Sequence, residues 1–342
     1  MTEQQYITTL EGLLSRLPIE ERQDIVQDIR EYFVDGREDG KTDDEISSSL
    51  GSPSSIADEL LTSYPEPSKA VQTNAGAEII HIQEDTFKDV SIEVQHGVLL
   101  LSPSDNHVTT VELLGSNDKL KLSAEVNGNT LVVKLKSLRP RFIMFSFSMK
   151  SVVLKVSIPK KLYDAISLKT DNGRICAEKL LSQSLHVISD NGRIDLSEVA
   201  TRVLETKTDN GRIEVTNTQA DRIFSKTDNG RIEMRYVEAD SIAVETDNGR
   251  IELSHVNGNI VGETDNGRIT LITNSLDRNI EMQTDNGSIQ IQTDEKPTNV
   301  TIHTKTAHGR VDVFGENNSR SVFGAGEHSI RLKSDNGRIT IQ

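Results

Sequence analysis

The residues most able to do chemistry are the Asp, Asn and Arg side chains of a turn that recurs through the second half of the chain, as in KTDNGRIEV at 207–215. Regularly spaced carboxylates could bind Ca²⁺, and a carboxylate pair could cleave a glycosidic bond. Either site needs a distinctive set of residues at one place. Because every acidic residue near these turns repeats from unit to unit, we predict no catalytic, cofactor-binding or metal site.

The turns recur with a nearly constant period. Asp-Asn-Gly begins at 171, 190, 209, 228, 247, 265, 285 and 335, and a degenerate AHG at 307 is interpreted as filling the long gap before 335. The successive intervals are 19, 19, 19, 19, 18, 20, 22 and 28 residues. Such a period is typical of a solenoid, and it differs from the nonapeptide of calcium-binding β-rolls.

The residues that flank each turn alternate between two faces, as in SIAVETDNGRIEL at 241–253. Ile242, Val244 and Thr246 share one face before the turn, and Ile251 and Leu253 share it afterwards. This period of two predicts strands on both sides of the turn, with these five side chains pointing inward.

Two arrangements of such strands fit the local pattern. Asn-Gly is favoured where two residues need positive φ, so each turn could close a β-hairpin. A β-helix explains the sameness of the units better, because each side chain then lies about 4.8 Å from its own copy. In that case the hydroxyl that precedes each Asp could pass a hydrogen bond along the stack. These hydroxyl residues are Thr170, Ser189, Thr208, Thr227, Thr246, Thr264, Thr284, Thr306 and Ser334.

The repeated charges are expected to form columns in such a stack. Like charges at this spacing repel by only about 1 kcal/mol in water, and a column of opposite charge offsets the repulsion. The Asp carboxylate could also accept a backbone N–H of its own turn. The arginine column comprises Arg174, Arg193, Arg212, Arg231, Arg250, Arg268, Arg310 and Arg338.

The segments VSIPKKLYDAISLKTDNGRI at 156–175 and SVFGAGEHSIRLKSDNGRITI at 321–341, together with the repeats, resemble the toast-rack family of bacterial proteins, often labelled "putative adhesins". The resemblance implies a mainly β fold, a single-stranded right-handed β-helix with coils of about 19 residues, over residues 78–342. The regular DNGR repeats occupy 165–342 of this domain.

An acidic helical domain is predicted for residues 1–64. Apolar spacing predicts helices over 4–17 and 19–39, with buried Ile7, Leu10, Leu13, Leu14 and Leu17 in the first. TDDE at 42–45 predicts a capping box for a third helix that ends at Gly51, and Ser52-Pro53 begins a fourth. The segment that holds TDDE and Ser52-Pro53, together with LPIEERQDIVQDIREYF at 17–33, resembles the helix-turn-helix-associated α-helical signalling domain of bacteria. That resemblance implies an adaptor without catalytic residues.

Composition limits the partners and the compartment. The 38 basic and 53 acidic residues give a net charge of −15, so we expect no nucleic-acid partner. Residues 1–64 hold 5 basic and 15 acidic residues, 5 − 15 = −10 of that total. Residues 65–77 are predicted to be a linker, because Pro, Ser, Gly and charged residues mix there without periodicity. One cysteine and no apolar run of membrane-spanning length predict a cytoplasmic protein without a membrane span.

Several features interrupt the repeat. The apolar segment 139–150 is expected to be a buried strand, with an exposed patch for a membrane or partner as the alternative. The glycine-rich segment 314–328 is a cap loop or a recognition loop. Cys176 should point outward as an incidental thiol, and His186 and His255 show no ligand spacing.

We therefore predict a non-catalytic binding or signalling scaffold, which by resemblance acts in bacterial cell-envelope or membrane stress regulation. A protein partner is expected on the helical domain. The alternatives are a surface adhesin and a carbohydrate-active β-helix enzyme. The last strand, GRITIQ at 337–342, is predicted to present a free edge that favours self-association.

Overall fold

The structure, a computed structural model, describes residues 1–15, 22, 25–26, 29–30, 33, 37, 42–57, 78–83, 85–115, 120–137 and 152–342. The chain forms two compact units. One comprises residues 1–76 with 141–152, and the other comprises residues 77–140 with 153–342. The predicted linker at 65–77 lies outside the described residues.

The helical unit begins with α1 (Glu3–Leu13) and includes α3 (Asp43–Leu50), and residues 53–57 are also helical. The capping box predicted at α3 is confirmed, since Thr42 and Glu45 bind each other's backbone N–H. Gly51 ends α3 with φ of 82°, and the Ser52 hydroxyl accepts the N–H of Ser55 at 3.1 Å. Both helix boundaries at 51–53 therefore follow the sequence prediction.

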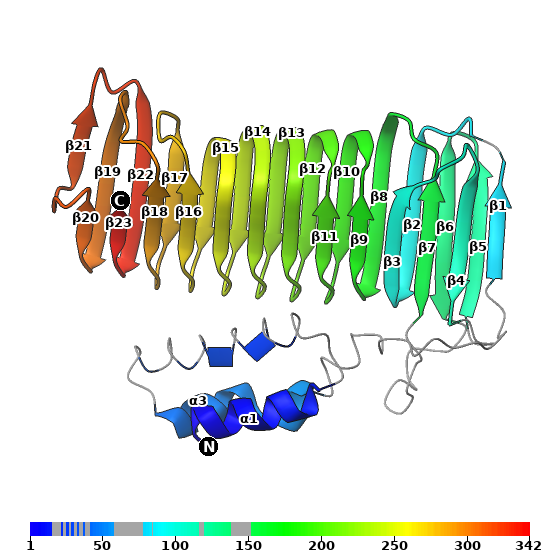
Figure 1. The fold of residues 1–342 in the computed structure, drawn as a ribbon, viewed down its shortest axis with the longest axis horizontal. Coiled ribbons are helices and arrows are strands. Elements are labelled where there is room, and N and C mark those ends of the chain that lie inside the picture. The colour runs from blue at the N-terminus through cyan, green and yellow to red at the C-terminus, as the bar shows by residue number, and fades with distance from the viewer. Residues whose placement is uncertain are drawn as a thin grey trace. The chain divides into compact units, whose positions relative to one another are not determined.

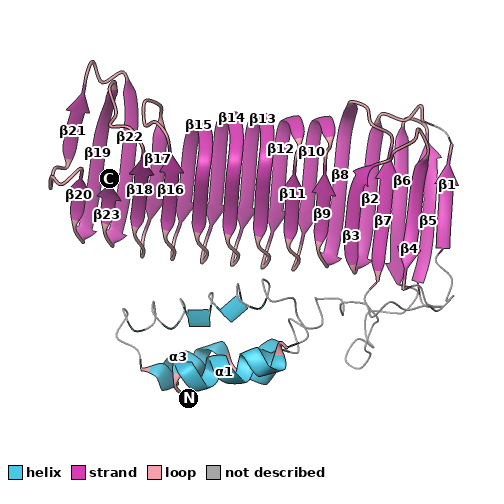
Figure 2. Ribbon diagram, in the orientation of Figure 1, coloured by secondary structure: helices cyan, strands magenta, loops and turns pink. Residues whose placement is uncertain are grey.

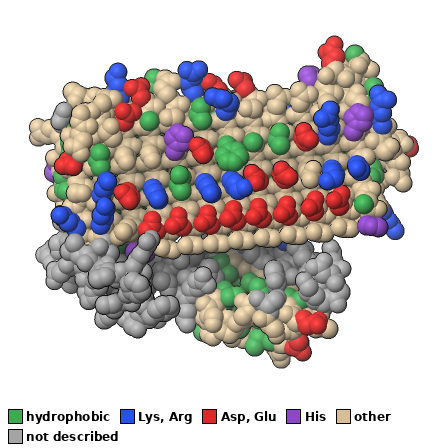
Figure 3. All heavy atoms as spheres, turned by 180° about the vertical axis from the view of Figure 1, so that it is seen from behind, with side chains coloured by type: hydrophobic (Ala, Val, Ile, Leu, Met, Phe, Trp, Pro, Cys, Tyr) green, Lys and Arg blue, Asp and Glu red, His purple; other side chains and the backbone are tan. Residues whose placement is uncertain are grey.

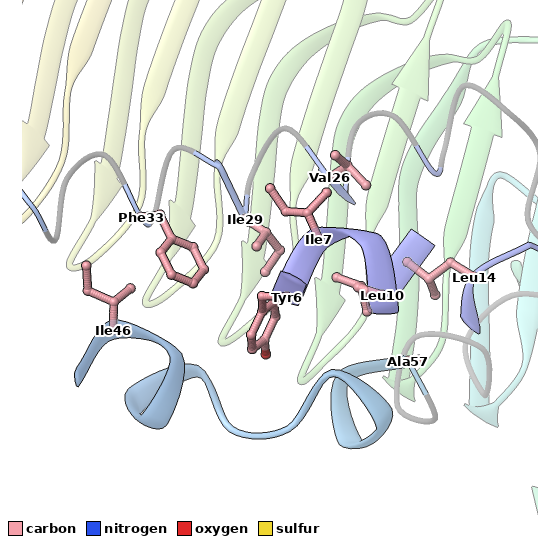
Figure 4. Packing of buried hydrophobic residues seen from close by; sticks show 9 residues of the cluster. All are labelled: Tyr6, Ile7, Leu10, Leu14, Val26, Ile29, Phe33, Ile46 and Ala57. Atoms are coloured by element: carbon pink, nitrogen blue, oxygen red, sulfur yellow. The ribbon is translucent and has the colours of Figure 1, made fainter. Parts of the chain in front are cut away.

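A small apolar core holds this unit together (Figure 4). The rings of Tyr6 and Phe33 meet edge to face at 5.7 Å, and the Tyr6 hydroxyl donates to the Gly51 carbonyl at 2.9 Å. The prediction for Leu13 is wrong, because its side chain is 40% exposed. The buried side chains of the core are Tyr6, Ile7, Leu10, Leu14, Val26, Ile29, Phe33, Ile46 and Ala57.

The second unit is a β-solenoid in which 23 strands of the described residues form one continuous sheet (Figures 1 and 2). Before the regular repeats lie β1 (Glu78–Ile82), β2 (Asp89–His96), β3 (Val98–Pro103), β4 (Thr109–Leu114), β5 (Leu120–Asn127), β6 (Thr130–Ser137), β7 (Val153–Ile158) and β8 (Tyr163–Asn172).

The repeats contain β9 (Ile175–Glu178), β10 (Leu181–Ser189), β11 (Ile194–Ser197), β12 (Ala200–Thr208), β13 (Ile213–Thr227), β14 (Ile232–Thr246), β15 (Ile251–Thr264), β16 (Ile269–Thr273), β17 (Ile280–Thr284) and β18 (Ile289–Thr293). The chain ends with β19 (Val300–His308), β20 (Val311–Val313), β21 (Arg320–Phe323), β22 (His328–Asn336) and β23 (Ile339–Ile341).

Successive coils are parallel and in register. Ile213 pairs with Ile232, and Ile232 pairs with Ile251, so equivalent residues lie directly over one another. The five side chains predicted to point inward from 241–253 are all buried. The meander of hairpins is thus excluded for the repeats, and the β-helix prediction is confirmed.

The C-terminal coil does not lie at the end of the stack. β22 pairs with β17 on one side and β19 on the other, and β23 likewise lies between β18 and β20. The prediction of a free edge at GRITIQ is therefore wrong. The turn at 307 does belong to the stack as a degenerate repeat, since Gly309 packs against the carbonyl of Gly337 as the DNG glycines pack against their neighbours, but it lies beyond the turn at 335, which stacks on the turn at 285.

The N-terminal end shows the same arrangement. β2 lies between β6 and β8, and β3 lies between β7 and β9, so the first coil is also placed one position inward. Antiparallel strands β1 and β4 continue the sheet from β7, and β5 pairs with β6. Stacked rings of Phe87 and Tyr163, 6.1 Å apart, are buried beside this region. Each end of the repeat is therefore enclosed by a segment distant in sequence.

Candidate functional site

The DNG turns are closed by the hydroxyl that precedes them. Thr208 Oγ1 accepts the N–H of Gly211 at 3.1 Å and donates to the carbonyl of Gly192, one coil back, at 3.2 Å. The same pair of bonds recurs at Thr227 and Thr246. Hydrogen bonding along the stack is thus confirmed, but it passes through a glycine carbonyl rather than from hydroxyl to hydroxyl.

Close approach between coils, rather than positive φ, explains the glycine of each turn. A Cβ atom on Gly211 would lie 1.9 Å from the carbonyl oxygen of Gly192. None of the DNG glycines from 173 to 337 has φ in the left-handed region. The Asn-Gly pair therefore serves a different purpose here than in the hairpin turns considered from the sequence.

The asparagines of the turns form a hydrogen-bonded ladder that the sequence reasoning missed. Asn210 donates from Nδ2 to Oδ1 of Asn191 at 2.7 Å, and Asn229 donates to Asn210 at 2.7 Å. The ladder continues from Asn172 to Asn286 and on to Asn336, which confirms the position of the C-terminal coil. The invariance of Asn within the repeat was the signal that could have revealed it.

Arginines of successive turns, including Arg174, Arg193 and Arg212, bind acidic residues of the next coil rather than the Asp residues of the turns. Arg174 Nε lies 2.5 Å from Asp195 Oδ2, and Arg193 Nη2 lies 2.7 Å from Glu214 Oε2. Arg212 pairs with Glu233, whose side chain is buried. A partly buried ion pair is favourable only when its two charged groups are well oriented. These pairs join adjacent coils, so they help to hold the coils in a defined register.

The Asp residues of the turns occupy one column, and Figure 3 shows a row of acidic side chains along one edge of the solenoid. Within the described part of the chain, no group of three His, Cys, Asp or Glu side chains is arranged to hold a metal ion. The repeated carboxylates form a charged edge of the solenoid.

A second corner of the coil needs a left-handed backbone and is occupied by side chains. Lys179, Glu198, Asn217, Tyr236 and His255 take this position in successive coils, with φ between 49° and 56°. Asn and His are enriched in this conformation, whereas a bulky residue such as Tyr there costs about 1–3 kcal/mol. Two aromatic residues at a strained corner are therefore a candidate functional feature.

Tyr236 and His255 form the centre of a groove beside this corner. Their rings stack with centroids 5.0 Å apart and an interplanar angle of 23°. The groove has a volume of about 600 Å³ and is also lined by Glu198, Asn217, Gln219 and Glu238. His255 was singled out in the sequence without a ligand role, and the signal that could have revealed its contact with Tyr236 is their separation by 19 residues, one period of the repeat.

Cys176 points outward in register with Asp195, as predicted, but it is half-buried. Burial raises the pKa of this thiol to about 11, although Arg174 lowers it and Asp195 raises it further. The thiol is therefore protonated at neutral pH, and the thiolate is the reactive form. His186 also points outward, with Nδ1 3.0 Å from Glu205.

The two segments that interrupt the repeat have different outcomes. The prediction for 139–150 falls outside the described residues. In the segment 314–328, β21 pairs antiparallel with β19, and the rings of Phe314 and Phe323 meet edge to face at 5.8 Å. This segment therefore covers the outer edge of β19, in the manner expected of a cap loop.

Among the described helices, none has the length and apolar character needed to cross a membrane. No curated protein matches the sequence. The parallel coils and their ladders define the class as a β-solenoid protein. The chain belongs to the Toastrack DUF4097 family, which it matches over residues 87–342, and residues 5–59 match the HAAS family.

Solved structures with a similar course of the chain include three bacterial proteins. A "putative adhesin" from Bacteroides fragilis shares 13% identity, with 80% of this chain and 100% of that chain covered and a TM-score of 0.44. A "putative lipid binding protein" from Parabacteroides distasonis shares 16% identity, with 79% of this chain and 98% of that chain covered and a TM-score of 0.49. A "putative adhesin" from the same organism shares 12% identity, with the same coverage of both chains and a TM-score of 0.48.

Proposed function

We propose that the protein is a non-catalytic scaffold in which the helical unit recruits a protein partner and the β-solenoid is a recognition surface. The pairing of the repeated charges carries this proposal. Arg193 and Arg212 bind carboxylates of neighbouring coils, so their charge stabilises the stacking of the coils. Repeated residues that stabilise one another leave function to the positions that vary, such as the corner that carries Tyr236.

The proposed biological role is regulation of the response to cell-envelope or membrane stress, in the cytoplasm. It rests on the HAAS match over residues 5–59 and on kinship with bacterial signalling modules. The surplus of acidic residues in the helical unit supports a partner with a basic surface, because opposite potentials steer association. The small core of this unit is compatible with additional stabilisation by a bound protein.

Affinity capture from the cell of origin tests the partner. The full chain should retain a protein that the chain without residues 1–64 does not retain. Glu11→Lys on the exposed side of α1 should weaken capture, whereas the matched change Glu316→Lys on the solenoid should not. Equal capture by the full and shortened chains would refute a role for the helical unit.

Two rival functions give different results. A surface adhesin would be found in the wall or supernatant fraction of the cell rather than in the cytoplasm. A carbohydrate-active enzyme would release reducing ends from a panel of polysaccharides. We expect a cytoplasmic location and no release, and either opposite result would replace the scaffold hypothesis with the corresponding rival.

A further inference from the structure

We propose that the groove beside Tyr236 binds a neutral, β-linked oligosaccharide, with one pyranose ring stacked on the tyrosine. This inference rests on the proposed function, because it names the ligand class of the solenoid's recognition surface. The groove, the stacked aromatic pair and the strained corner are three separate observations that meet at the same place.

The aromatic pair is not a requirement of the fold. The same left-handed corner holds Lys179, Glu198 and Asn217 in the preceding coils. The coil therefore accepts long, charged and short polar side chains at this position. Selection of Tyr236 and His255 in adjacent coils consequently calls for an explanation outside the backbone, and strained residues concentrate where a ligand binds.

The tyrosine ring is presented in a fixed orientation. Its side chain is 59% exposed, and one ring face is covered by the imidazole of His255. The neighbouring coil on the other side carries the small side chain of Asn217, which leaves space over the second face. A rigid, open aromatic face loses little conformational entropy on binding and stacks on the C–H face of a sugar ring.

The dimensions of the groove fit an extended ligand. Its lining includes residues at 198, 217, 236, 255 and 274, one from each of five successive coils. Four steps of about 4.8 Å give a length of roughly 19 Å along the solenoid axis. A chain of several sugars fits this length better than a single small molecule.

The polar lining fits hydroxyl groups rather than anions. Amides of Asn217 and Gln219 can donate and accept hydrogen bonds, and Gln219 Nε2 lies 3.4 Å from Glu238 Oε2. Glu198 and Glu238 accept hydrogen bonds from sugar hydroxyls, and their charge repels carboxylate-bearing glycans. The groove therefore favours a neutral oligosaccharide.

An extended peptide is a poorer fit for this groove. Peptides commonly bind by adding a strand to an open sheet edge. Here β14 already pairs with β13 and β15 on both sides, including Gln219 with Glu238 and Val237 with Val256. Main-chain groups of the coils are thus used within the solenoid, and recognition depends on side chains.

Isothermal titration of the full chain with cellohexaose and chitohexaose tests the inference, with oligogalacturonate as the anionic probe and an extended Gly/Ser peptide as the non-sugar probe. We expect binding of a neutral β-linked hexamer. Tyr236→Asn should weaken it about tenfold, because Asn217 shows that the corner tolerates Asn while the stacking face is lost. Tyr236→Phe should retain it.

A matched control removes an aromatic side chain elsewhere. Phe224 is 38% exposed on β13, outside the residues that line the groove, and Phe224→Thr should leave binding unchanged. Absence of binding to both neutral hexamers, tighter binding of the anionic or peptide probe, or equal losses in Tyr236→Asn and Phe224→Thr would each overturn the inference. Because partner capture by the helical unit is measured separately, such a failure would leave the proposed scaffold testable.

Discussion

At the scale of single residues, the repeated turn is fixed by steric and hydrogen-bonding constraints that act between coils. The hydroxyl of Thr208 closes its own turn and contacts the preceding coil, and Gly211 provides the space for that contact. The repeat is uniform because each residue of the turn has to fit its own copy. Function is more readily placed at the second corner, where residue types vary.

We expect Gly211→Ala to lower the free energy of unfolding by at least about 2 kcal/mol, because its methyl group would overlap the carbonyl oxygen of Gly192. Urea denaturation followed by circular dichroism measures the change. Gly262→Ala is the control, since a Cβ there would meet Val244 and Met282 at 3.6 and 3.7 Å, ordinary contact distances. Equal stability of the two variants would contradict the proposed role of close packing.

The thiol of Cys176 should react slowly in the native protein. Burial raises its pKa to about 11, so at pH 8 its thiolate fraction is lower, on the order of 100-fold, than in the unfolded chain. Alkylation by iodoacetamide should therefore be slow in buffer, fast in urea, and should still accelerate as the pH rises above 9. A native rate that levels off near pH 9 would show an unperturbed thiol.

The inward or outward direction of side chains was predicted from the sequence more reliably than the residues that they contact. Alternation placed Ile242, Val244 and Thr246 in the interior correctly, because period two depends only on the strand. The acidic partners of Arg174, Arg193 and Arg212 were not predicted, because each lies one coil away and two positions beyond the next arginine. The stack of Tyr236 on His255 was missed although one 19-residue period separates the two residues, because only the DNG turns were compared between coils.

At the scale of elements, the order of coils departs from the order of the sequence. The intervals of 22 and 28 residues before and after 307 marked the departure, but a sequential stack was the simpler interpretation. Spacing shows that a coil exists, whereas its neighbours depend on where the connecting loop returns. The segment around β21 makes that return possible by covering β19.

Two truncations test the inserted coil. Removal of residues 328–342 deletes β22 and β23, so β19 and β20 lose the strands that join them to β17 and β18. Limited proteolysis should then cleave within 300–327. Removal of the longer segment 299–342 should give a more protease-resistant product, because it ends the stack at β17 and β18. Greater resistance of the shorter deletion would contradict this strand order.

The order of the strands also changes which surface could mediate the predicted self-association. β23 is paired on both sides, so an exposed edge at the C-terminal end of the solenoid has to come from the outer strands β20 and β21. Self-association through the C-terminal end of the solenoid remains a prediction, but β20 and β21 would form the contact surface in place of β23. Sedimentation velocity over a range of concentrations would show it as a rise in the sedimentation coefficient, and a constant value would exclude it.

At the scale of the whole molecule, charge is distributed unevenly between the two parts of the sequence. Residues 1–64 contribute −10 and the remaining residues contribute (38 − 5) − (53 − 15) = −5 to the net charge. The first part is suited to electrostatic recognition, whereas the groove of the solenoid is proposed to bind a neutral ligand. The two binding events should consequently respond differently to salt.

We expect partner capture by the helical unit to fall several-fold as the salt concentration rises from about 0.1 to about 1 M, because the Debye length shrinks from about 10 to about 3 Å. Binding of the neutral hexamer to the same chain should change little and provides the internal control. Quantitative capture and titration at four salt concentrations measure both. Salt-independent capture would remove the electrostatic argument for a basic partner.

The inserted C-terminal coil also has a consequence for synthesis. β22 and β23 follow β19 and β20 in the sequence but lie between those strands and β17 and β18. During synthesis the segment 300–313 therefore emerges before the strands that it pairs with, and it has to wait, or to move aside, until residues 328–341 have been made. A chain that stopped before β22 would carry unpaired strands at that end of the solenoid.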